Sequence, residues 1–254
     1  MLPAPCYLFS DAHLGVATPD TEQELLAFLR HLPSDARSVV INGDLFDFWF
    51  EWKHVVPRAG IRVLGELSRI VDAGIQVLWV AGNHDCWGGD VLRRDLGLKY
   101  QVGPWRGVIG GWDTVVEHGD GLREREDAPY RRLRTVLRHP WSVRLYRLLH
   151  PDWGTALALR SSHTSRNYRP SDGGEGLRTV AHAKLSGPGA PQLLIYGHSH
   201  VATLEKVGGR VFANPGPWLD SPRFLRISPG LVEACRWTGG EYVVESSVTD
   251  LATD

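Results

Sequence analysis

Side chains that bind metal ions follow apolar stretches at five places along this sequence. Each place combines a predicted strand with an aspartate, asparagine or histidine directly after it. The residues are Asp11, His13, Asp44, Asn83, His84, Asp85, His118, His198 and His200. One such residue alone is more often structural than a ligand, but their shared position at strand ends predicts one common site. Carboxylate, amide and imidazole ligands without a thiolate favour Mn²⁺, Fe or Zn²⁺.

The candidate ligands are too many for one ion, so we expect two divalent ions, with Mn²⁺ as the expected metal. Asp44 is the natural bridge between them, because it offers two oxygens and has no histidine beside it. Two ions roughly 3.5–4 Å apart can share a hydroxide that attacks phosphorus in line. Their positive charge offsets the charge that builds on the phosphoryl oxygens. The expected chemistry is hydrolysis of a phosphate ester or anhydride.

The order of these motifs resembles the calcineurin-like metallophosphoesterase superfamily. Its pattern is Asp-x-His, Gly-Asp, Gly-Asn-His-Asp, a lone His and Gly-His-x-His, and all five blocks occur here in that order between residues 11 and 200. The resemblance implies that one ion is held by Asp11, His13, Asp44 and His200. It implies that the other is held by Asp44, Asn83, His118 and His198. His84 would contact the phosphate and stabilise or protonate the leaving group, with Asp85 orienting it.

The elements that must position these residues are strands alternating with helices. Apolar runs at 38–41, 75–81, 114–116 and 193–196 predict buried strands, and the periodicity of 61–71 predicts a helix between the first two. This alternation predicts an α/β fold with parallel strands at its centre. Three alternating segments after residue 224 predict antiparallel strands of a second sheet. The resemblance implies a four-layer α/β/β/α sandwich with an inserted helical cap. Residues 88–108 are expected to be irregular, with a short helix near 91–96.

The composition changes between residues 121 and 191. Arginines crowd this segment, and its apolar residues keep a helical period that is interrupted at Pro140, which predicts two helices. Residues 166–176 are polar and Gly-rich and are expected to be mobile, and residues 177–185 predict a further helix. We therefore predict a core of residues 1–120 and 192–254, with an inserted helical cap at 121–191 that contributes to substrate binding.

Within the superfamily the chain resembles the UDP-2,3-diacylglucosamine pyrophosphohydrolases of lipid A biosynthesis. The resemblance is carried by 10–15, 43–49 and 118–120, and then by Asp127, Tyr130, Arg134, Ala156 and Arg160. It implies cleavage of the pyrophosphate bond to give 2,3-diacylglucosamine 1-phosphate and UMP. It differs at His84, where the best-known branch of that family has Arg.

Substrate contacts are expected from Asn83, Arg123, Tyr130, Arg134 and Arg160. Arginine can bind a diphosphate through paired hydrogen bonds. The apolar stripe of the insertion, including Trp141, Leu145 and Leu149, could line a slot for acyl chains or rest on an anionic membrane leaflet. The alternative is that this stripe packs on its own domain.

The properties of the whole chain limit the expected location of the protein and its expected partners. The formal net charge of −1 gives no push toward nucleic acid, which is not an expected partner. The three cysteines are widely spaced and predict free thiols in a reducing compartment. We recognise no signal peptide and no apolar run of the ~20 residues that span a bilayer. We expect a cytoplasmic protein that binds a nucleotide-linked lipid and can contact the inner membrane surface peripherally.

Two other functions stay open at this point. The same two-metal site could act on a small nucleotide, a phosphoprotein or nucleic acid. A non-catalytic scaffold that keeps the fold is the alternative from another class. Such proteins typically lose metal ligands, whereas all the expected ligands are present here.

Overall fold

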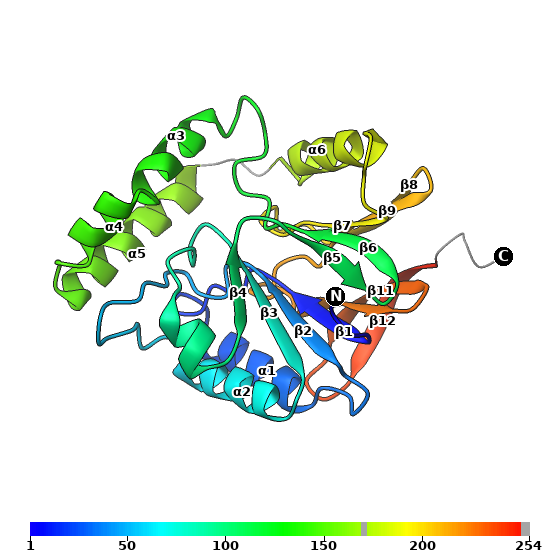
Figure 1. Cartoon of the computed structure of the whole chain (residues 1–254), viewed down its shortest axis with the longest axis horizontal. Helices are drawn as coiled ribbons and strands as arrows, with labels where there is room; N and C mark the ends of the chain where they lie inside the picture. The colour runs from blue at the N-terminus through cyan, green and yellow to red at the C-terminus, as the bar shows by residue number, and fades with distance from the viewer. Residues whose placement is uncertain (169–171, 250–254) are drawn as a thin grey trace.

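A sheet of seven strands forms one half of this computed structural model, which describes residues 1–168 and 172–249 (Figure 1). The strand order is β12-β11-β10-β1-β2-β3-β4, and β1 to β4 run parallel. The strands are β1 (Cys6–Phe9), β2 (Ser38–Asn42), β3 (Gln76–Ala81), β4 (Lys99–Val102), β10 (Arg223–Ser228), β11 (Leu231–Trp237) and β12 (Tyr242–Thr249). The antiparallel strands predicted after residue 224 are present, but they join this first sheet rather than a second one.

Sheet two has five strands in the order β5-β6-β7-β9-β8, with β6, β7 and β9 parallel. The strands are β5 (Trp105–Ile109), β6 (Trp112–Val116), β7 (Leu193–Ile195), β8 (Thr203–Val207) and β9 (Arg210–Asn214). Alternate side chains explain why the two sheets stack. In β1, Cys6 and Leu8 enter the core between the sheets, while Tyr7 and Phe9 enter the core under the helices.

Helices cover the outer faces of both sheets. The helices α1 (Pro19–Arg30) and α2 (Ile61–Asp72) pack their apolar sides on the seven-stranded sheet. On the five-stranded sheet, α6 (Glu175–Ser186) packs through Leu177, Ala181 and Leu185. The predicted four-layer α/β/β/α sandwich is therefore confirmed.

Three helices, α3 (Ala128–Leu137), α4 (Pro140–Tyr146) and α5 (Pro151–Tyr168), stand together at one end of the sandwich (Figure 1). We call α3, α4 and α5 the cap. The break between α3 and α4 falls at Pro140 as predicted. The last helix of the predicted insertion, α6, packs on a sheet and not with the cap. The division into core and cap remains a prediction.

Two stretches differ from the sequence predictions. Residues 88–108 hold a short π-helix, η1 (Val91–Asp95), close to the predicted helix, but β4 and the first part of β5 replace the expected irregular chain. Residues 166–176 were expected to be mobile, which stays a prediction, and both ends of the stretch are helical, since α5 continues to Tyr168 and α6 begins at Glu175. Residues 169–171 of that stretch lie outside the described residues.

Among the described residues, none of the helices combines the length and the apolar character that a bilayer span requires.

A candidate two-metal site at the strand ends

The predicted ligands come together where the parallel strands of both sheets end. Asp11 and His13 follow β1, Asp44 follows β2, and Asn83 follows β3 in the seven-stranded sheet. Two more loops come from the second sheet, after β6 and after β7. They carry His118, His198 and His200. Parallel strands place their carboxyl ends at one edge, and stacking the two sheets brings the two edges together.

Asp11, His13 and His200 form one group of possible ligands. The Nε2 atoms of His13 and His200 face each other at 3.3 Å. Nε2 of His200 also lies 3.3 Å from Oδ1 of Asp11. All three side chains therefore turn a ligand atom toward one point, as the ligands of a metal ion must.

Asp44, His118 and His198 form a second group, with Nε2 of His118 lying 3.1 Å from Oδ2 of Asp44. The same Oδ2 lies 4.0 Å from Nε2 of His13, which belongs to the first group. Asp44 thus sits between the two groups, where the bridging role predicted for it requires it to be. The geometry also groups Asp44 and His13 with His84, which the resemblance leaves out of the ligand set.

The backbone at these residues is strained. Among the described residues, the non-glycine residues with positive φ are Asp11, His13, Asp44, His198 and His200, with φ between 46° and 59°. Left-handed backbone costs a side-chain-bearing residue on the order of 1–3 kcal/mol and clusters at functional sites. All five belong to the predicted ligand set. The fold therefore tolerates a loss of stability at these residues in order to point their side chains into the site.

Glycines give the ligands room. A Cβ on Gly82 would collide with the carboxylate of Asp44, and one on Gly43 would collide with the ring of His118. A Cβ on Gly197 would lie 2.9 Å from Oδ2 of Asp11. Each glycine of the sequence motifs therefore lets one ligand approach a neighbouring loop.

Contacts behind the ligands fix their orientation. Nδ1–H of His118 donates to the carbonyl of Asn42 at 2.9 Å, which turns Nε2 toward Asp44. Oδ2 of Asp11 accepts the backbone N–H of His198 at 3.2 Å, so Oδ1 is the oxygen that faces His200. Partners of this kind set the tautomer and direction of metal-binding side chains.

Burial and neighbouring charges shift the pKa values of the side chains in the site. Burial raises the pKa of Asp11, but the hydrogen bond and charge of His200 and the charge of His118 outweigh it, so that this pKa is about 2. Burial and the charge of His118 lower the pKa of His198 to about 4. Burial lowers the pKa of His118, but the charge of Asp44 overrides it and raises this pKa well above its usual range. Asp11 and His198 therefore have the ionised and neutral forms that metal ligands require at neutral pH.

The residues fit divalent cations. Oδ1 of Asn83 is buried without a hydrogen bond within the described part of the chain, although it can ligate a metal. Asp44 raises the pKa of His118, which marks a place where positive charge is stabilised. The set contains carboxylate, amide and imidazole donors, which suit Mn²⁺, Fe or Zn²⁺.

His84 and Asp85 are held differently from the prediction. Nδ1–H of His84 donates to the carbonyl of Asp47 at 2.8 Å, which leaves Nε2 facing the site, 3.9 Å from Oδ2 of Asp44. The two carboxylate oxygens of Asp85 accept the backbone N–H groups of Leu45 and Gly82, each at 2.8 Å. The orienting contact predicted for Asp85 is made by Asp47, and Asp85 instead ties the loops after β2 and β3 together.

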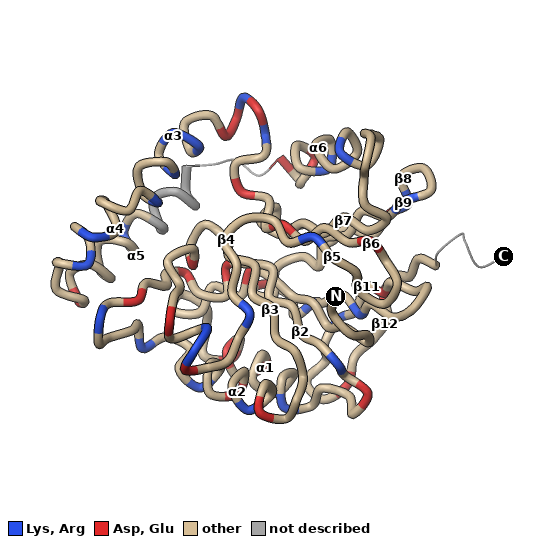
Figure 2. The backbone as a smooth tube through the Cα atoms, viewed as in Figure 1, with Lys and Arg blue, Asp and Glu red and all other residues tan. Residues whose placement is uncertain are grey.

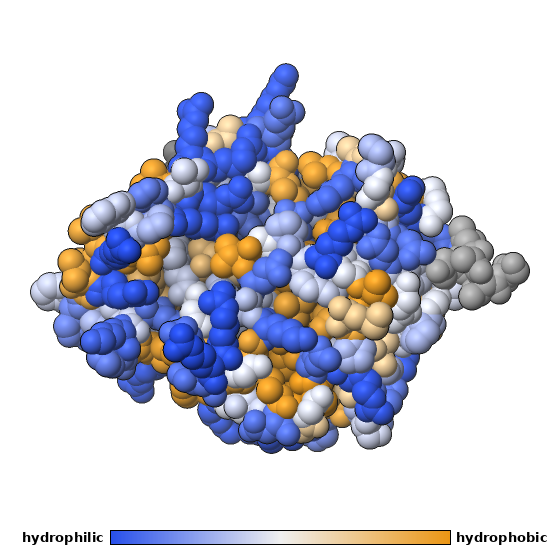
Figure 3. Space-filling model, viewed as in Figure 1, coloured by the Kyte–Doolittle hydropathy of each residue, from blue (hydrophilic) through white to orange (hydrophobic). Residues whose placement is uncertain are grey.

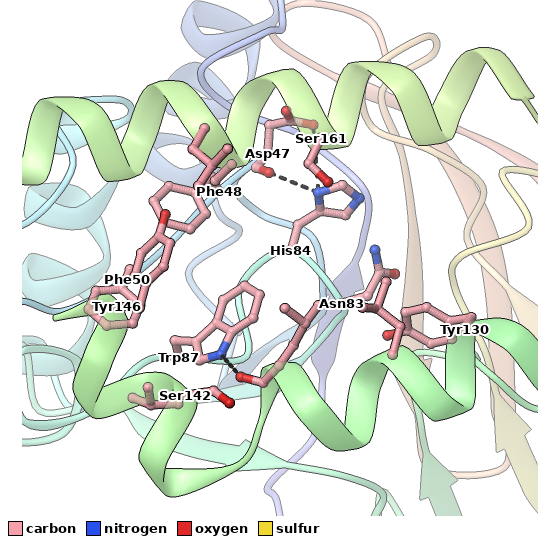
Figure 4. A pocket seen from close by; sticks show the side chains of 15 residues that line it. Asp47, Phe48, Phe50, Asn83, His84, Trp87, Tyr130, Ser142, Tyr146 and Ser161 are labelled. Atoms are coloured by element: carbon pink, nitrogen blue, oxygen red, sulfur yellow. Dashed lines mark hydrogen bonds and ion pairs between the residues drawn. The ribbon is translucent and has the colours of Figure 1, made fainter. Parts of the chain in front are cut away.

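A cavity of about 440 Å³ opens beside Asn83 and His84 and runs under the cap (Figure 4). Its lining is mostly aromatic and aliphatic. It includes Phe48, Phe50, Trp87, Tyr130, Leu133, Leu137, Val143, Tyr146, Leu157 and Ala158. In Figure 4, Phe48, Phe50 and Tyr146 stand on one side of the cavity. A phosphate at the metal groups could therefore carry an apolar substituent into this space.

Of the predicted substrate contacts between residues 121 and 191, Tyr130 lines this cavity. Its hydroxyl donates to Oδ2 of Asp120 at 2.6 Å, and Nη1 of Arg134 lies 3.2 Å from the same oxygen. Arg123 pairs with Asp127 at 2.9 Å. Arg160 is exposed on α5, directly before Ser161, which lines the cavity.

The predicted wall of the cavity was wrong. Trp141, Leu145 and Leu149 do not line it, and Trp141 and Leu145 are 65% and 64% exposed. The inner side of α4 is formed by Ser142, Val143 and Tyr146 instead. The part of the apolar stripe that Trp141 and Leu145 form therefore belongs to the outer face of the cap, whereas Leu133 and Leu137 line the cavity.

Two residues near the ligands had no predicted role. Asp47 lies against the rings of His13 and His84, and Asp120 holds donors from α3. Both lie within the sequence motifs that carried the resemblance, three residues after Asp44 and two after His118. A buried carboxylate needs a partner, so their position next to ligands was the available signal.

Residues 4–202 match the model of the calcineurin-like phosphoesterase family. A UDP-2,3-diacylglucosamine hydrolase of Porphyromonas gingivalis is 35% identical over 185 residues, which are 70% of this chain and 68% of that protein. A UDP-2,3-diacylglucosamine hydrolase of Neisseria meningitidis is 31% identical over 230 residues, which are 88% of this chain and 94% of that protein. Yfce, a phosphoesterase from E. coli, shares the fold with a TM-score of 0.51 at 16% identity, over 96% of this chain and 98% of that chain.

Proposed function

This chain belongs to the calcineurin-like phosphoesterase family and is a metal-dependent phosphoesterase, and we propose that it hydrolyses the pyrophosphate bond of UDP-2,3-diacylglucosamine. The products would be 2,3-diacylglucosamine 1-phosphate and UMP. The observation that carries the proposal is the apolar cavity that opens directly at Asn83 and His84. A substrate with a diphosphate next to acyl chains matches a site in which metal ligands adjoin apolar walls.

In this proposal one divalent ion is held by Asp11, His13, Asp44 and His200, and the other by Asp44, Asn83, His118 and His198. Mn²⁺ is the ion we propose, since the donors are carboxylate, amide and imidazole. When bound, the ions would lower the pKa of a coordinated water and offset negative charge on the phosphate.

His84 is the catalytic residue that we assign beside the metal ligands. The carbonyl of Asp47 holds Nδ1–H, so Nε2 is the nitrogen that can reach a phosphate at the site. From there it can stabilise a negative phosphoryl oxygen or give a proton to the leaving group. Asn83, next to it in the chain, can donate its amide N–H to the same phosphate.

The cavity would take the acyl chains. Phe48, Leu133, Val143 and Leu157 supply apolar walls, and Tyr130 lies near Asn83 in the lining of the cavity (Figure 4). Burial of each additional CH₂ group contributes about 0.8 kcal/mol, so acyl chains would add strongly to binding. Arg160 and the two other arginines, Arg123 and Arg134, remain proposed contacts for the nucleotide and diphosphate.

The outer face of the cap suits a membrane surface, where such a lipid is found. Trp141, Leu145, Leu148 and Trp153 are 65%, 64%, 82% and 74% exposed. Each such side chain forgoes about 1.5–3 kcal/mol that full burial would give. Figure 3 shows hydrophobic surface beside hydrophilic surface on this part of the molecule.

The charge of the cap matches an anionic leaflet. Residues 128–149 include six arginines and neither aspartate nor glutamate, and Figure 2 shows their positions along α3 and α4. The guanidinium of Arg144 lies 5.3 Å from the ring centre of Trp141, a pairing of cation and aromatic side chain. We propose peripheral contact of α4 and the start of α5 with the cytoplasmic face of the membrane.

Hydrolysis assays test the substrate. The protein is incubated with UDP-2,3-diacylglucosamine and, separately, with an aryl phosphodiester, each with Mn²⁺ and with chelator. We expect Mn²⁺-dependent release of UMP from the lipid at a much lower KM than for the aryl compound. Cleavage of the aryl compound alone would reject the lipid and leave a phosphodiesterase with a smaller substrate.

Vesicle sedimentation tests the membrane contact. Trp141→Ser with Leu148→Ser should lower binding to vesicles that contain anionic lipid. Val243→Ser, an exposed apolar residue on β12, is the matched control and should bind as the parent does. Equal binding by all three proteins would reject this surface.

A further inference from the structure

Tyr146, the last residue of α4, closes the cavity on the side away from the metal groups. In Figure 4 it stands with Phe50 at one end of the cavity, while Asn83 and Tyr130 stand at the other. We propose that Tyr146 limits the length of the acyl chains that the site accepts. This inference rests on the proposed function, because it names the residue that selects among lipids of the proposed class.

The ring of Tyr146 separates the cavity from tightly packed side chains. Its centre lies 4.9 Å from the ring centre of Phe50 and 6.1 Å from that of Trp52. Among the described residues, Phe50 lines the cavity, whereas Trp52 does not and is only 7% exposed. An apolar chain that enters from the metal groups therefore meets the ring of Tyr146 before it can reach Trp52.

Hydrogen bonds hold this end of the cavity in place. The hydroxyl of Tyr146 donates to the carbonyl of Gly154 on α5 at 2.6 Å. Burial raises the pKa of Tyr146 to about 12, so the hydroxyl keeps its proton at neutral pH. Nε1–H of Trp52 donates to the carbonyl of Leu149, between α4 and α5, at 3.2 Å. The ring of Tyr146 is thus tied to α5, and the turn behind it is tied to the core.

Gly154 shows how completely the space behind Tyr146 is filled. Gly154 is buried, and a Cβ on it would lie 2.9 Å from the ring of Trp52 and 3.3 Å from the hydroxyl of Tyr146. Close-packed groups of this kind transmit strain rather than yield to it. A chain that is too long must therefore displace the ring of Tyr146 or bend back, and either response weakens binding.

Chain length acts on affinity in two opposite ways at such a barrier. Each CH₂ group that the cavity buries should strengthen binding about fourfold, which corresponds to about 0.8 kcal/mol. The gain ends when the last carbon touches Tyr146, and we call the chain length at this point the limiting length. Removal of the ring opens the space in front of Trp52 and should move the limiting length upward.

Leu133 provides a matched control in the same cavity. It lines the cavity from α3 and is 53% exposed, so it borders solvent rather than packed side chains. Leu133→Ala removes apolar contacts without opening the closed end. It should weaken the binding of chains of different lengths alike and leave the limiting length unchanged. Tyr146→Phe keeps the ring and loses only the hydroxyl, so it should also keep the limiting length of the parent.

Inhibition by alkyl phosphonates measures the limiting length without the lipid substrate. The parent and the three variants Tyr146→Ala, Tyr146→Phe and Leu133→Ala hydrolyse an aryl phosphodiester with Mn²⁺, in competition with phosphonates of increasing chain length below their micelle concentrations. For the parent, the inhibition constant should fall with each added CH₂ group and stop falling at the limiting length. Tyr146→Ala should bind the next longer phosphonates about tenfold more tightly than the parent does, since two further buried CH₂ groups contribute about 1.6 kcal/mol.

The same proteins are then compared on UDP-2,3-diacylglucosamines of graded acyl length. The profile of kcat/KM against length should end at a longer chain for Tyr146→Ala than for the parent. If the phosphonates show this change while none of the UDP-lipids is hydrolysed, the proposed substrate is wrong, and Tyr146 limits the chain length of another lipid phosphoester.

Three results would overturn the inference. The first is a parent whose inhibition constant does not depend on phosphonate length, because the cavity then takes no chain. The second is a Tyr146→Ala protein with the limiting length of the parent. The third is a Leu133→Ala protein whose limiting length moves as far as that of Tyr146→Ala. Should Tyr146→Ala fail to fold, Tyr146→Leu, which also shortens the side chain, decides by the same measurements.

Discussion

The floor of the site and the cap above it are built in opposite ways. The floor consists of loops at strand ends, where Asp11, His13, Asp44 and His118 are each at most 2% exposed. Among the described residues, neither α3 nor α4 has a buried side chain. The floor is fixed by backbone and packing on all sides, whereas the cap covers the site from outside.

Polar contacts to Asp120 and an apolar cluster with Phe48, Phe50 and Trp52 hold the cap on the core. Asp120, in the loop after His118, accepts the hydroxyl of Tyr130 at 2.6 Å and lies 3.2 Å from Arg134 and 3.4 Å from Arg138. These three residues follow each other at every fourth position, so one face of α3 and the residue after its end make the contacts to Asp120. Segments with few buried contacts open more readily than cores. The rigid floor therefore determines the reaction, and the cap determines the access of substrate.

The largest effect should come from the centre of the floor. Asp44→Ala removes the carboxylate that lies between both ligand groups, so both ions should be lost. Activity on any phosphoester should fall by ~10³-fold or more, since metal ions contribute several kcal/mol to the transition state. Metal content after dialysis and kcat/KM measure this. Asp113→Ala, which removes an exposed ion pair with Arg106, is the control. A variant of Asp44 that retains one tightly bound ion would contradict the bridging role of Asp44.

A second large effect should separate chemistry from metal binding. His84→Ala should lower kcat by about 10²–10⁴-fold, the range for a group that transfers or holds a proton. Metal content should stay near that of the parent, because His84 lies outside the proposed ligand set. Nε2 of His84 lies only 3.9 Å from Oδ2 of Asp44, so the metal content of the variant tests whether His84 is a ligand. If the variant loses a metal ion, then His84 is a ligand and its assigned role is wrong.

A glycine tests how tightly the floor is packed. Gly82→Ala would push a Cβ into the carboxylate of Asp44, so we expect metal affinity to fall by about 10–100-fold. Gly65→Ala is the matched control, since a Cβ there meets nothing within 4 Å and lies in α2. It should unfold at the same or a higher temperature, because alanine favours a helix by roughly 1 kcal/mol over glycine. Normal metal affinity in Gly82→Ala would show that the loops can relax, against the rigid floor.

The smallest effect should come from the cap and should depend on the substrate. Asp120→Asn weakens the contacts of Tyr130, Arg134 and Arg138, so α3 should be held less firmly. KM for the lipid should rise about tenfold, the scale of a charged hydrogen bond of ~1.5 kcal/mol. The aryl phosphodiester should be cleaved nearly as before. Tyr130→Phe removes the hydroxyl that donates to Asp120 and so tests the same contact from the cap side. Equal losses of activity on both substrates would place Asp120 in the floor instead.

Strand ends and ligands could be predicted from the sequence because the signal is local. An apolar run that stops at Gly-Asn-His-Asp predicts both a strand and the ligand that follows it. Parallel pairing of the strands then brings the ligands of different loops to one edge of the sheet. The alternation of strands with helices predicted the α/β class, and the resemblance to the family implied the four layers. The edge strands β4 and β5 were missed, since Lys99 and Gln101 leave half of β4 polar and Gly107 interrupts β5.

The cap was predicted less well for a physical reason. Helical periodicity gives a stripe but not the direction in which it points, and the rule that stripes face the core fails for Trp141 and Leu145. The roles of Asp47 and Asp120 depend on which distant rings and guanidinium groups come near them. Such contacts are set by tertiary structure and leave no periodic pattern in the sequence.

Anomalous diffraction from crystals grown with Mn²⁺, measured at the manganese absorption edge, tests the central claim most directly. We predict two peaks roughly 3.5–4 Å apart, the usual spacing in two-metal sites, with the carboxylate of Asp44 between them. Asp11, His13 and His200 should surround one peak, and Asn83, His118 and His198 the other. A single peak, or peaks away from these residues, would contradict the account.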